Sequence, residues 1–208
     1  MEFEEAYREG NLPWDIGEPQ PALAELVDAG WCVGTVLDAG CGTGELALAV
    51  AARGHEVLGV DLAHAAVERA EQKAAERGLS ATFRAADITS LEGSFDTVLD
   101  SGLLHSLPPE DQSRYLAMLG RVCRDRVAIL CFADRPGART PNGAGVTETR
   151  LLELFAPDWR IDEVVPVDIL GIIPDDMDEY RTWPRDDRGR TLMTGWRLRA
   201  GRKPIMTG

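Results

Sequence analysis

The sequence predicts an α/β fold in which helices cover both faces of a doubly wound, largely parallel sheet. Apolar runs that read as buried strands alternate with longer stretches of helical periodicity between residues 21 and 132. Three of these runs end in an acid, at Asp38, Asp61 and Asp100. Because the carboxyl ends of parallel strands meet at one edge of a sheet, these acids are expected to converge there.

The elements follow in order along the chain. Five strands are predicted, at residues 35–39, 56–61, 82–85, 94–100 and 126–132. Helices are predicted at residues 21–29, 45–53, 64–77, 109–123 and 147–155, the last with Thr147 as its N-cap. Two more strands are expected at 159–169 and 191–198. The charged residues of the 64–77 helix, Lys73 among them, are assigned to a solvated face.

The first strand leads into a glycine-rich turn. Val36 and Leu37 precede the sequence Asp38-Ala39-Gly40-Cys41-Gly42-Thr43-Gly44-Glu45, after which the apolar periodicity of a helix begins. Glycine adopts positive φ freely and, lacking Cβ, lets a bound molecule lie directly on the backbone. The turn is therefore predicted to be a ligand site, although a glycine turn that only connects a strand to a helix is the alternative.

Two common phosphate-binding motifs do not fit this turn. A dinucleotide fingerprint has Gly or Ala three residues after its second glycine, to pack the helix close to the pyrophosphate. The corresponding residue is Glu45, whose carboxylate would repel a pyrophosphate. No Gly-Lys-Ser/Thr follows, which excludes a P-loop. An acidic turn suits a cationic ligand instead.

The pattern D-x-G-x-G-x-G resembles motif I of the class I S-adenosylmethionine-dependent methyltransferases, whose donor carries an ammonium and a sulfonium group. The resemblance extends over essentially the whole chain. It implies a Rossmann-like sheet of seven strands, mostly parallel with an antiparallel last strand. It also implies S-adenosyl-L-methionine as cofactor and S-adenosyl-L-homocysteine as product.

The resemblance assigns roles to residues at the ends of successive strands. Asp61 would accept hydrogen bonds from both ribose hydroxyls, a role that an acid at this place also has in NAD enzymes. Asp87 would accept from the adenine amino group, with a turn or capping role as the alternative, and Ile88 would pack on the ring. Asp100, or its carbonyl, would meet the ammonium group. The predicted donor contacts are Trp14, Asp38, Gly40, Cys41, Gly42, Thr43, Gly44, Asp61, Leu62, Asp87, Ile88, Asp100 and Ser101.

Residues 12–21 are rich in Pro, Gly and aromatic side chains and lack the composition of a disordered tail. This run resembles the N-terminal lid of small-molecule thiol, halide, thiopurine and heterocycle methyltransferases, which have a comparable Pro-Trp-Asp element. The resemblance implies that Trp14 packs over the donor and Asp15 helps to position it. The alternative is that Trp14 only anchors an N-terminal extension on the core.

His105 follows the fourth strand, where the resembled family places the methyl end of the donor. An imidazole there is a candidate general base, because it could take a proton from an attacking hydroxyl, thiol or ring nitrogen. The alternative is a histidine that hydrogen-bonds the backbone and shapes the turn before Pro108 and Pro109. The sequence favours the alternative slightly.

Composition limits the partners. The net charge of −13 disfavours nucleic acid and anionic membrane surfaces and favours a small-molecule acceptor. The sequence has no signal peptide pattern and no apolar run of membrane-spanning length, which predicts a cytoplasmic protein. The four cysteines lack metal-binding spacing and are expected to be reduced thiols. The acidic run at 175–178 is interpreted as an exposed loop near the acceptor, and no metal site is predicted.

Together these features predict a methyltransferase that transfers a methyl group to O, S or N of a small aromatic or heterocyclic molecule. One domain is expected over residues 1–208, with a lid and helix at 1–30 and the Rossmann-like core at 31–208. The alternatives are an NAD-dependent oxidoreductase and a catalytically silent regulator that binds S-adenosylmethionine. The identity of the acceptor and the oligomeric state are not predicted, and acceptor pockets are expected from the loops at 1–20, 101–108, 133–145 and 170–190.

Overall fold

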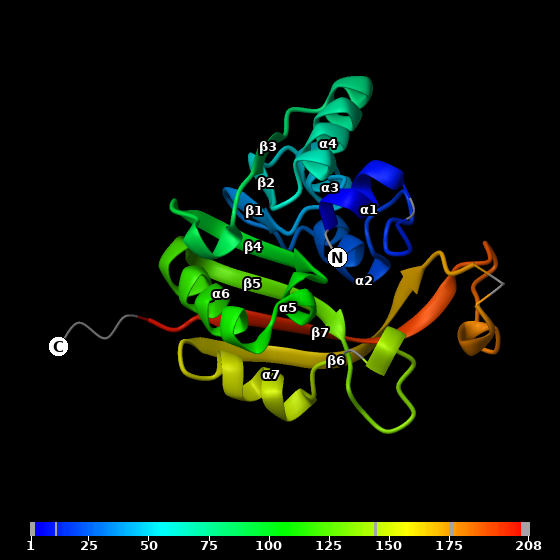
Figure 1. Cartoon of the computed structure of the whole chain (residues 1–208). Helices are drawn as coiled ribbons and strands as arrows, with labels where there is room; N and C mark the ends of the chain where they lie inside the picture. Colours follow the sequence, from blue (N-terminus) through cyan, green and yellow to red (C-terminus); the bar gives the residue numbers. More distant parts are fainter. Residues whose placement is uncertain (1–2, 11, 144, 175–176, 205–208) are drawn as a thin grey trace.

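The computed structural model describes residues 3–10, 12–143, 145–174 and 177–204. A seven-stranded sheet runs through these residues in the order β3-β2-β1-β4-β5-β7-β6 (Figure 1). Strand β7 is antiparallel to both of its neighbours, and the other neighbouring pairs are parallel, as predicted. The strands are β1 Val36–Ala39, β2 Val57–Asp61, β3 Thr82–Ala85, β4 Phe95–Ser101, β5 Cys123–Phe132, β6 Trp159–Gly171 and β7 Thr191–Arg202.

Helices cover both faces of the sheet. Buried side chains of α2, α3 and α4 form one core cluster, and those of α5, α6 and α7 form another. The α-helices are α1 Phe3–Glu9, α2 Pro21–Asp28, α3 Glu45–Ala52, α4 His64–Arg77, α5 Leu103–Ser106, α6 Pro109–Val122 and α7 Glu148–Phe155. Three 3₁₀ turns complete the list: η1 Ile88–Ser90, η2 Pro141–Gly143 and η3 Asp178–Tyr180.

Strand β1 shows why the central strands are apolar throughout. Val36 belongs to the cluster under α2, α3 and α4, whereas Leu37 belongs to the cluster under α6 and α7. Both are fully buried, since a parallel sheet is covered on both faces. β1 lies between β2 and β4, so the strand order reverses at β1, and ligands of such sheets bind at this switch point.

Two helices were not predicted from the sequence. Helix α1 packs against α4 at the carboxyl end of the sheet, through Tyr7 and a small cluster with Ala66. Helix α5 is a four-residue turn in the segment after β4 that was expected to be a loop. The N-cap of α7 was predicted correctly, since the Thr147 hydroxyl accepts a hydrogen bond from the Arg150 N–H at 3.1 Å.

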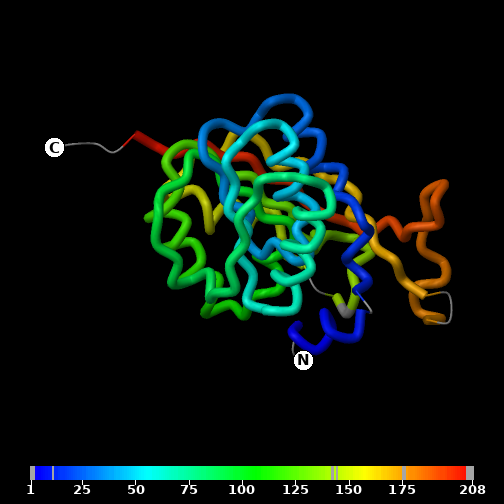
Figure 2. The backbone as a smooth tube through the Cα atoms, turned by 90° about the horizontal axis from the view of Figure 1, so that it is seen from above, coloured from blue at the N-terminus to red at the C-terminus, as the bar shows by residue number. Residues whose placement is uncertain are grey.

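The segment between β6 and β7 extends from the carboxyl end of the sheet (orange in Figures 1 and 2). We call its described residues, 172–174 and 177–190, the insertion. Asp175 and Asp176 of the predicted acidic loop lie outside the described residues. Within the described part of the chain, no three acids, histidines or cysteines are grouped to hold a metal ion. No helix in that part is long and apolar enough to cross a bilayer.

Candidate active site

A cleft opens beside the carboxyl ends of β1 and β4, between the glycine turn and the N-terminal segment. It brings together seven of the predicted donor contacts, which come from three separate parts of the chain. The lining residues are Tyr7, Trp14, Asp15, Glu18, Pro19, Gln20, Asp38, Gly40, Cys41, Gly42, Thr43, Glu45, Leu46 and Ser101. Gly44, Asp61, Leu62, Asp87, Ile88 and Asp100 are not part of this lining.

The glycine turn depends on backbone conformations that other residues rarely adopt. Gly42 and Gly44 have φ angles of +51° and +85°, and Gly44 immediately precedes α3. A Cβ atom on Gly44 would lie 2.8 Å from the Ala70 Cβ, so glycine allows α4 to pack closely on the turn. A Cβ atom on Gly42 would lie 2.9 Å from the Tyr7 hydroxyl. A larger residue at position 42 would therefore have to adopt a strained φ and displace the Tyr7 side chain.

Asp38 has a buried carboxylate with one unpaired oxygen. Its Oδ2 accepts a hydrogen bond from the Ala47 N–H of α3 at 3.0 Å, whereas its Oδ1 is buried and has no partner among the described residues. Burial raises the pKa of Asp38 to about 7. Burying a carboxylate oxygen without a hydrogen-bond donor costs free energy, and a cation bound at Oδ1 would offset this cost.

Asp61 lies at the end of β2 and holds the turn in place. Its Oδ2 accepts from the Gly42 N–H and its Oδ1 from the Ala63 N–H, both at 2.9 Å. Burial raises its pKa, and these backbone hydrogen bonds oppose the rise. The next side chain, Leu62, is 71% exposed, which leaves it free to cover a bound nucleoside.

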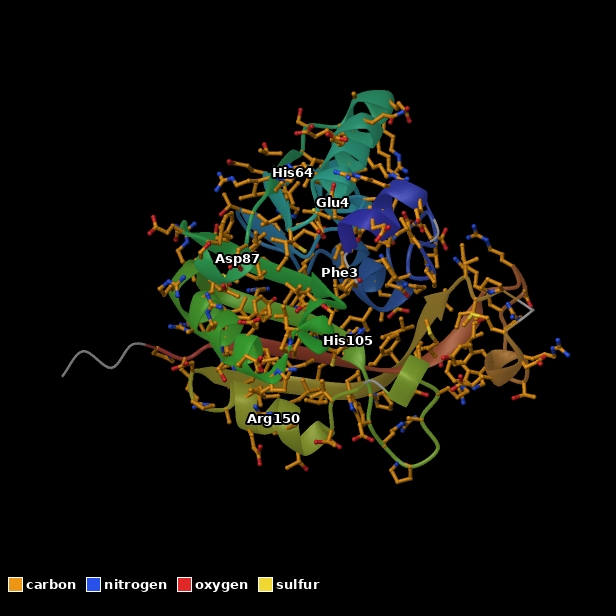
Figure 3. All side chains as sticks on the ribbon, viewed as in Figure 1. Phe3, Glu4, His64, Asp87, His105 and Arg150 are labelled. Atoms are coloured by element: carbon orange, nitrogen blue, oxygen red, sulfur yellow. The ribbon has the colours of Figure 1, made fainter. Side chains whose placement is uncertain are left out.

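Asp87 and Ile88 mark the edge beyond β3. Asp87 Oδ1 accepts from the N–H and the hydroxyl of Thr89, at 2.9 and 2.8 Å, and so caps η1. The capping role given as the alternative is therefore present. The carboxylate is exposed at the edge of the sheet (Figure 3), whereas Ile88 is buried in the core cluster with Val60. Their predicted contacts with adenine stay predictions.

Asp100 uses its carboxylate within the protein. Its Oδ1 accepts from the Leu103 N–H at 2.7 Å, and its Oδ2 accepts from the Leu104 N–H at 3.1 Å and the Tyr115 hydroxyl at 3.0 Å. Burial raises the pKa of Asp100 to about 7. The carboxylate thus accepts hydrogen bonds from the first N–H groups of α5 and from Tyr115. Of the two predicted partners for the donor's ammonium group, the geometry therefore favours the Asp100 carbonyl over its carboxylate. The neighbouring Ser101 faces the cleft.

Comparisons with known proteins show the family to which the chain belongs. The family model described as "Methyltransferase domain" matches residues 36–126, from β1 into β5. The 2-heptyl-1-hydroxyquinolin-4(1H)-one methyltransferase of Mycobacteroides abscessus is 34% identical over 96% of both chains. The chain belongs to the S-adenosylmethionine-dependent methyltransferases. It is an enzyme of this family, and the NAD-dependent oxidoreductase and the silent regulator are excluded.

Solved structures of similar fold support the assignment to this family. A structure described as "Conversion of a Disulfide Bond into a Thioacetal Group during Echinomycin Biosynthesis" has a TM-score of 0.81 and 33% identity, over 99% of this chain and 92% of that chain. The magnesium protoporphyrin IX methyltransferase of Synechocystis, with bound S-adenosylmethionine, has a TM-score of 0.64 and 26% identity, over 88% and 76%. S-Adenosylmethionine is therefore the methyl donor of this protein, as of its relatives.

His105 lies on α5 of the methyltransferase and is half-buried. Its Nδ1 (His105 is labelled in Figure 3) accepts a hydrogen bond from the Phe132 N–H of β5 at 3.3 Å. The His105 and Phe132 rings are tilted, with centroids 4.3 Å apart. Burial lowers the pKa of His105 to about 4, so the ring is neutral near pH 7. Since Nδ1 is engaged, the proton of the neutral ring is on Nε2. The geometry favours the structural alternative over a general base.

The N-terminal segment of the methyltransferase covers the turn with aromatic side chains. Trp14 is 43% exposed and its Nε1 donates to the Tyr7 hydroxyl at 3.2 Å. Phe3 and Tyr7 both meet the Trp14 ring edge to face, with centroids 5.9 and 6.0 Å away. Trp14 is thus held by α1 while it lines the cleft. Sequence reasoning missed the role of Tyr7, because α1 was not predicted.

Lys73 contradicts its assignment to a solvated face. Its Nζ donates to the Thr43 hydroxyl at 2.7 Å and to Glu45 at 2.8 Å. Arg77 binds both oxygens of Glu45, at 2.8 and 2.9 Å. Glu45 therefore does not lie free at the start of α3, because α4 neutralises it. The spacing of Lys73 and Arg77, one helical turn apart, was the available signal.

Proposed function

We propose that this methyltransferase transfers the methyl group to O, S or N of a small aromatic heterocycle. The observation that carries the proposal is the 34% identity, over 96% of both chains, with an enzyme named for a 1-hydroxyquinolin-4-one acceptor. A neighbour of the same fold has 1,6-didemethyltoxoflavin bound with S-adenosylhomocysteine. Aromatic and apolar side chains that line the cleft, such as Tyr7, Trp14 and Leu46, suit a planar acceptor.

The proposal places the donor along the edge of the sheet. Its ribose lies at Asp61 and its adenine between Asp87, Ile88 and Leu62, as the resemblance implies. The ammonium group lies at Asp38, because Asp38 Oδ1 is unpaired whereas the Asp100 carboxylate is filled. This arrangement directs the methyl group toward Ser101. The remaining predicted contacts come from Trp14, over the donor, and from the backbone of the turn, at Gly40, Cys41, Gly42, Thr43 and Gly44.

The chemistry asks little of the side chains. The positive sulfur already activates the methyl group, so the protein has to align the nucleophile with the S–CH₃ bond and exclude water. An electron pair of the acceptor forms the new bond to carbon, the sulfur keeps the electrons of the broken bond, and the acceptor loses a proton. An acidic acceptor ionises in water before it binds, so this step proceeds without a side-chain base. This agrees with the engaged Nδ1 of His105.

The proposal also covers the class of partner and the organisation of the domain. The net charge of −13 supports a free small molecule as partner, in place of nucleic acid or a membrane surface. Residues 1–30 act as lid and first helix and residues 31–208 as the core of one domain. A cytoplasmic location remains a prediction.

A methylation assay tests the acceptor class. The full chain is incubated with S-adenosylmethionine and, separately, with 2-heptyl-1-hydroxyquinolin-4(1H)-one, a simple phenol and a small aliphatic thiol, and products are identified by mass spectrometry. The proposal expects a methylated quinolone, formed faster than either other product. Methylation of the thiol or phenol with an unmodified quinolone would contradict it.

A further inference from the structure

The N-terminal segment touches both sides of the active site. We call residues 12–20 the strap. The strap contacts the donor turn through Asp15, whose Oδ2 accepts a hydrogen bond from the Thr43 hydroxyl at 2.7 Å. Asp15 Oδ1 in turn accepts from the Gly17 N–H at 3.0 Å, which fixes the bend of the strap. Five of the fourteen residues that line the cleft belong to the strap.

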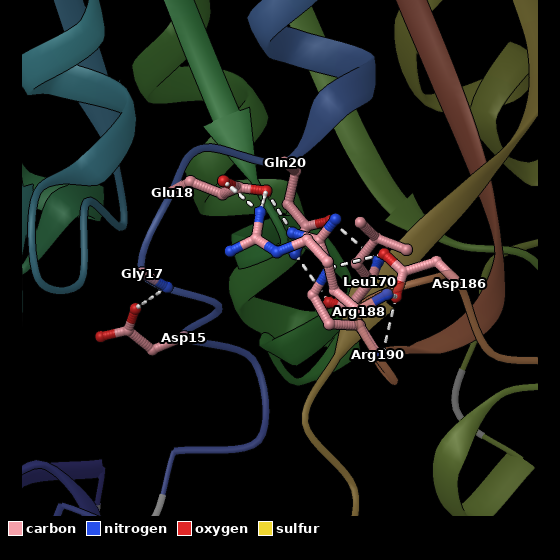
Figure 4. A network of polar contacts seen from close by, with 8 residues as sticks. All are labelled: Asp15, Gly17, Glu18, Gln20, Leu170, Asp186, Arg188 and Arg190. Carbon is pink, nitrogen blue, oxygen red and sulfur yellow. Dashed lines mark hydrogen bonds and ion pairs between the residues drawn. The ribbon is translucent and has the colours of Figure 1, made fainter.

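The strap also contacts the first stem of the insertion, at the end of β6, through both Pro13 and Gln20. The Gln20 side chain is 8% exposed, and its amide pairs with the Leu170 backbone in both directions, at 2.8 and 2.9 Å. The Ile172 N–H donates to the Pro13 carbonyl at 2.7 Å. These bonds attach the strap to the place where the insertion begins, and Figure 4 shows the pairing of Gln20 with Leu170.

The second stem of the insertion is bound through charge. Both Glu18 oxygens accept from Arg188, at 2.9 and 2.8 Å, and Glu18 also pairs with Arg190 (Figure 4). The Arg190 side chain is only 13% exposed, and its Nε donates to Asp186 at 2.7 Å. The hydrogen bonds from Arg188 and Arg190 lower the pKa of Glu18. Because two guanidinium groups neutralise Glu18, its role is to tie the stem rather than to bind the cationic donor.

We propose that the strap couples the two substrates: donor binding further stabilises the contact between the strap and the turn, and the strap in turn positions the insertion for the acceptor. Glu18 is the positioning residue of this coupling. The inference rests on the proposed function in one respect, namely that the insertion frames the acceptor site. Coupling through one element is reciprocal, so the acceptor tightens donor binding by the same factor by which the donor tightens acceptor binding.

The first test is independent of the acceptor. Hydrogen–deuterium exchange of the full chain is measured with and without S-adenosylhomocysteine, in peptides from residues 177–190. The wild type is expected to show slower exchange there when the product is bound. Glu18→Gln is expected to lose more than half of this protection. Asp111→Asn breaks an exposed ion pair with Arg114 on α6, away from the strap, and is expected to keep it.

The second test uses the acceptor that the methylation assay identifies. Glu18→Gln is expected to raise the acceptor KM by roughly twofold to fivefold, with a smaller change in kcat, because the two ion pairs that hold the stem share a Glu18 side chain that is 38% exposed. Arg188→Gln removes the more exposed half of the contact and is expected to act in the same direction, more weakly. Thermal melting checks that each variant is folded.

The outcomes separate the coupling from the proposed function. The coupling is overturned if the bound product leaves exchange at 177–190 unchanged in the wild type, or if Glu18→Gln keeps full protection. It is also overturned if Glu18→Gln and Asp111→Asn have equal acceptor KM values. Failure of the wild type to methylate any heterocycle would refute the acceptor class alone, since the exchange result does not depend on it.

Discussion

Asp38→Asn tests which carboxylate meets the ammonium group of the donor. Asp38 Oδ1 is buried and finds no partner among the residues that the structure describes, whereas Oδ2 accepts from the Ala47 N–H. A hydrogen bond to a charged group contributes about 1.5–3 kcal/mol, and about 1.4 kcal/mol corresponds to a tenfold change in Kd. The Kd of S-adenosylhomocysteine is therefore expected to rise roughly 10- to 100-fold in isothermal titration calorimetry at pH 7.5.

The pH dependence of this affinity has a defined sign. Burial raises the Asp38 pKa to about 7 in the ligand-free protein, so the carboxyl gains a proton as the pH falls below 7. The ammonium group binds the ionised form. Wild-type affinity is therefore expected to weaken from pH 7 to pH 5.5, by at most about tenfold per pH unit for one proton. Asp38→Asn lacks this titration, and its Kd is expected to stay nearly constant over that range.

Asp100→Asn is the matched control, because the Asp100 pKa is also about 7 and its carboxylate is equally buried. Its three protein donors predict a loss of stability, about 1–3 kcal/mol for each group left unsatisfied, with little change in affinity. Equal Kd values and equal pH slopes for wild type and Asp38→Asn would refute the reasoning. A loss of affinity confined to Asp100→Asn would return the ammonium group to Asp100.

Three further substitutions test other parts of the site. Asp61→Ala is expected to weaken S-adenosylhomocysteine binding by roughly 100-fold or more in calorimetry, since two hydrogen bonds to a charged group are lost; unchanged affinity would discard its ribose role. Gly42→Ala is expected to weaken binding more than Gly54→Ala, because both have positive φ but only the Gly42 Cβ would meet Tyr7. His105→Asn is expected to keep turnover within about threefold and an unchanged rate profile from pH 6 to 9; a loss above 100-fold with normal donor affinity would make His105 the base.

The sequence predicted the sheet well because its signals are local. Each central strand is an apolar run that is followed by a glycine or ends in an acid. These runs alternate with helical segments, and this alternation favours a parallel sheet. The glycine turn, Asp61 and the end of β4 could be placed for the same reason. Helix α4 was predicted with both of its observed ends, His64 and Arg77, since Gly78 follows it with a positive φ.

The remaining features depend on contacts between distant segments. Asp100 was assigned to the donor, but α5 is only four residues long and gave no periodic signal that its N–H groups would use the carboxylate. Lys73 was placed in solvent because its partners, Thr43 and Glu45, lie 30 and 28 residues away. The strap was visible only as a run of Pro, Gly and aromatic residues, and its partner at Leu170 is 150 residues distant from Gln20.

A crystal structure of the full chain with S-adenosylhomocysteine tests the central claim most directly. The account predicts the nucleoside on the turn from Asp38 to Gly44, both ribose hydroxyls within hydrogen-bond distance of Asp61, and the sulfur directed toward Ser101. A product molecule bound elsewhere, or a ribose turned away from Asp61, would contradict the account.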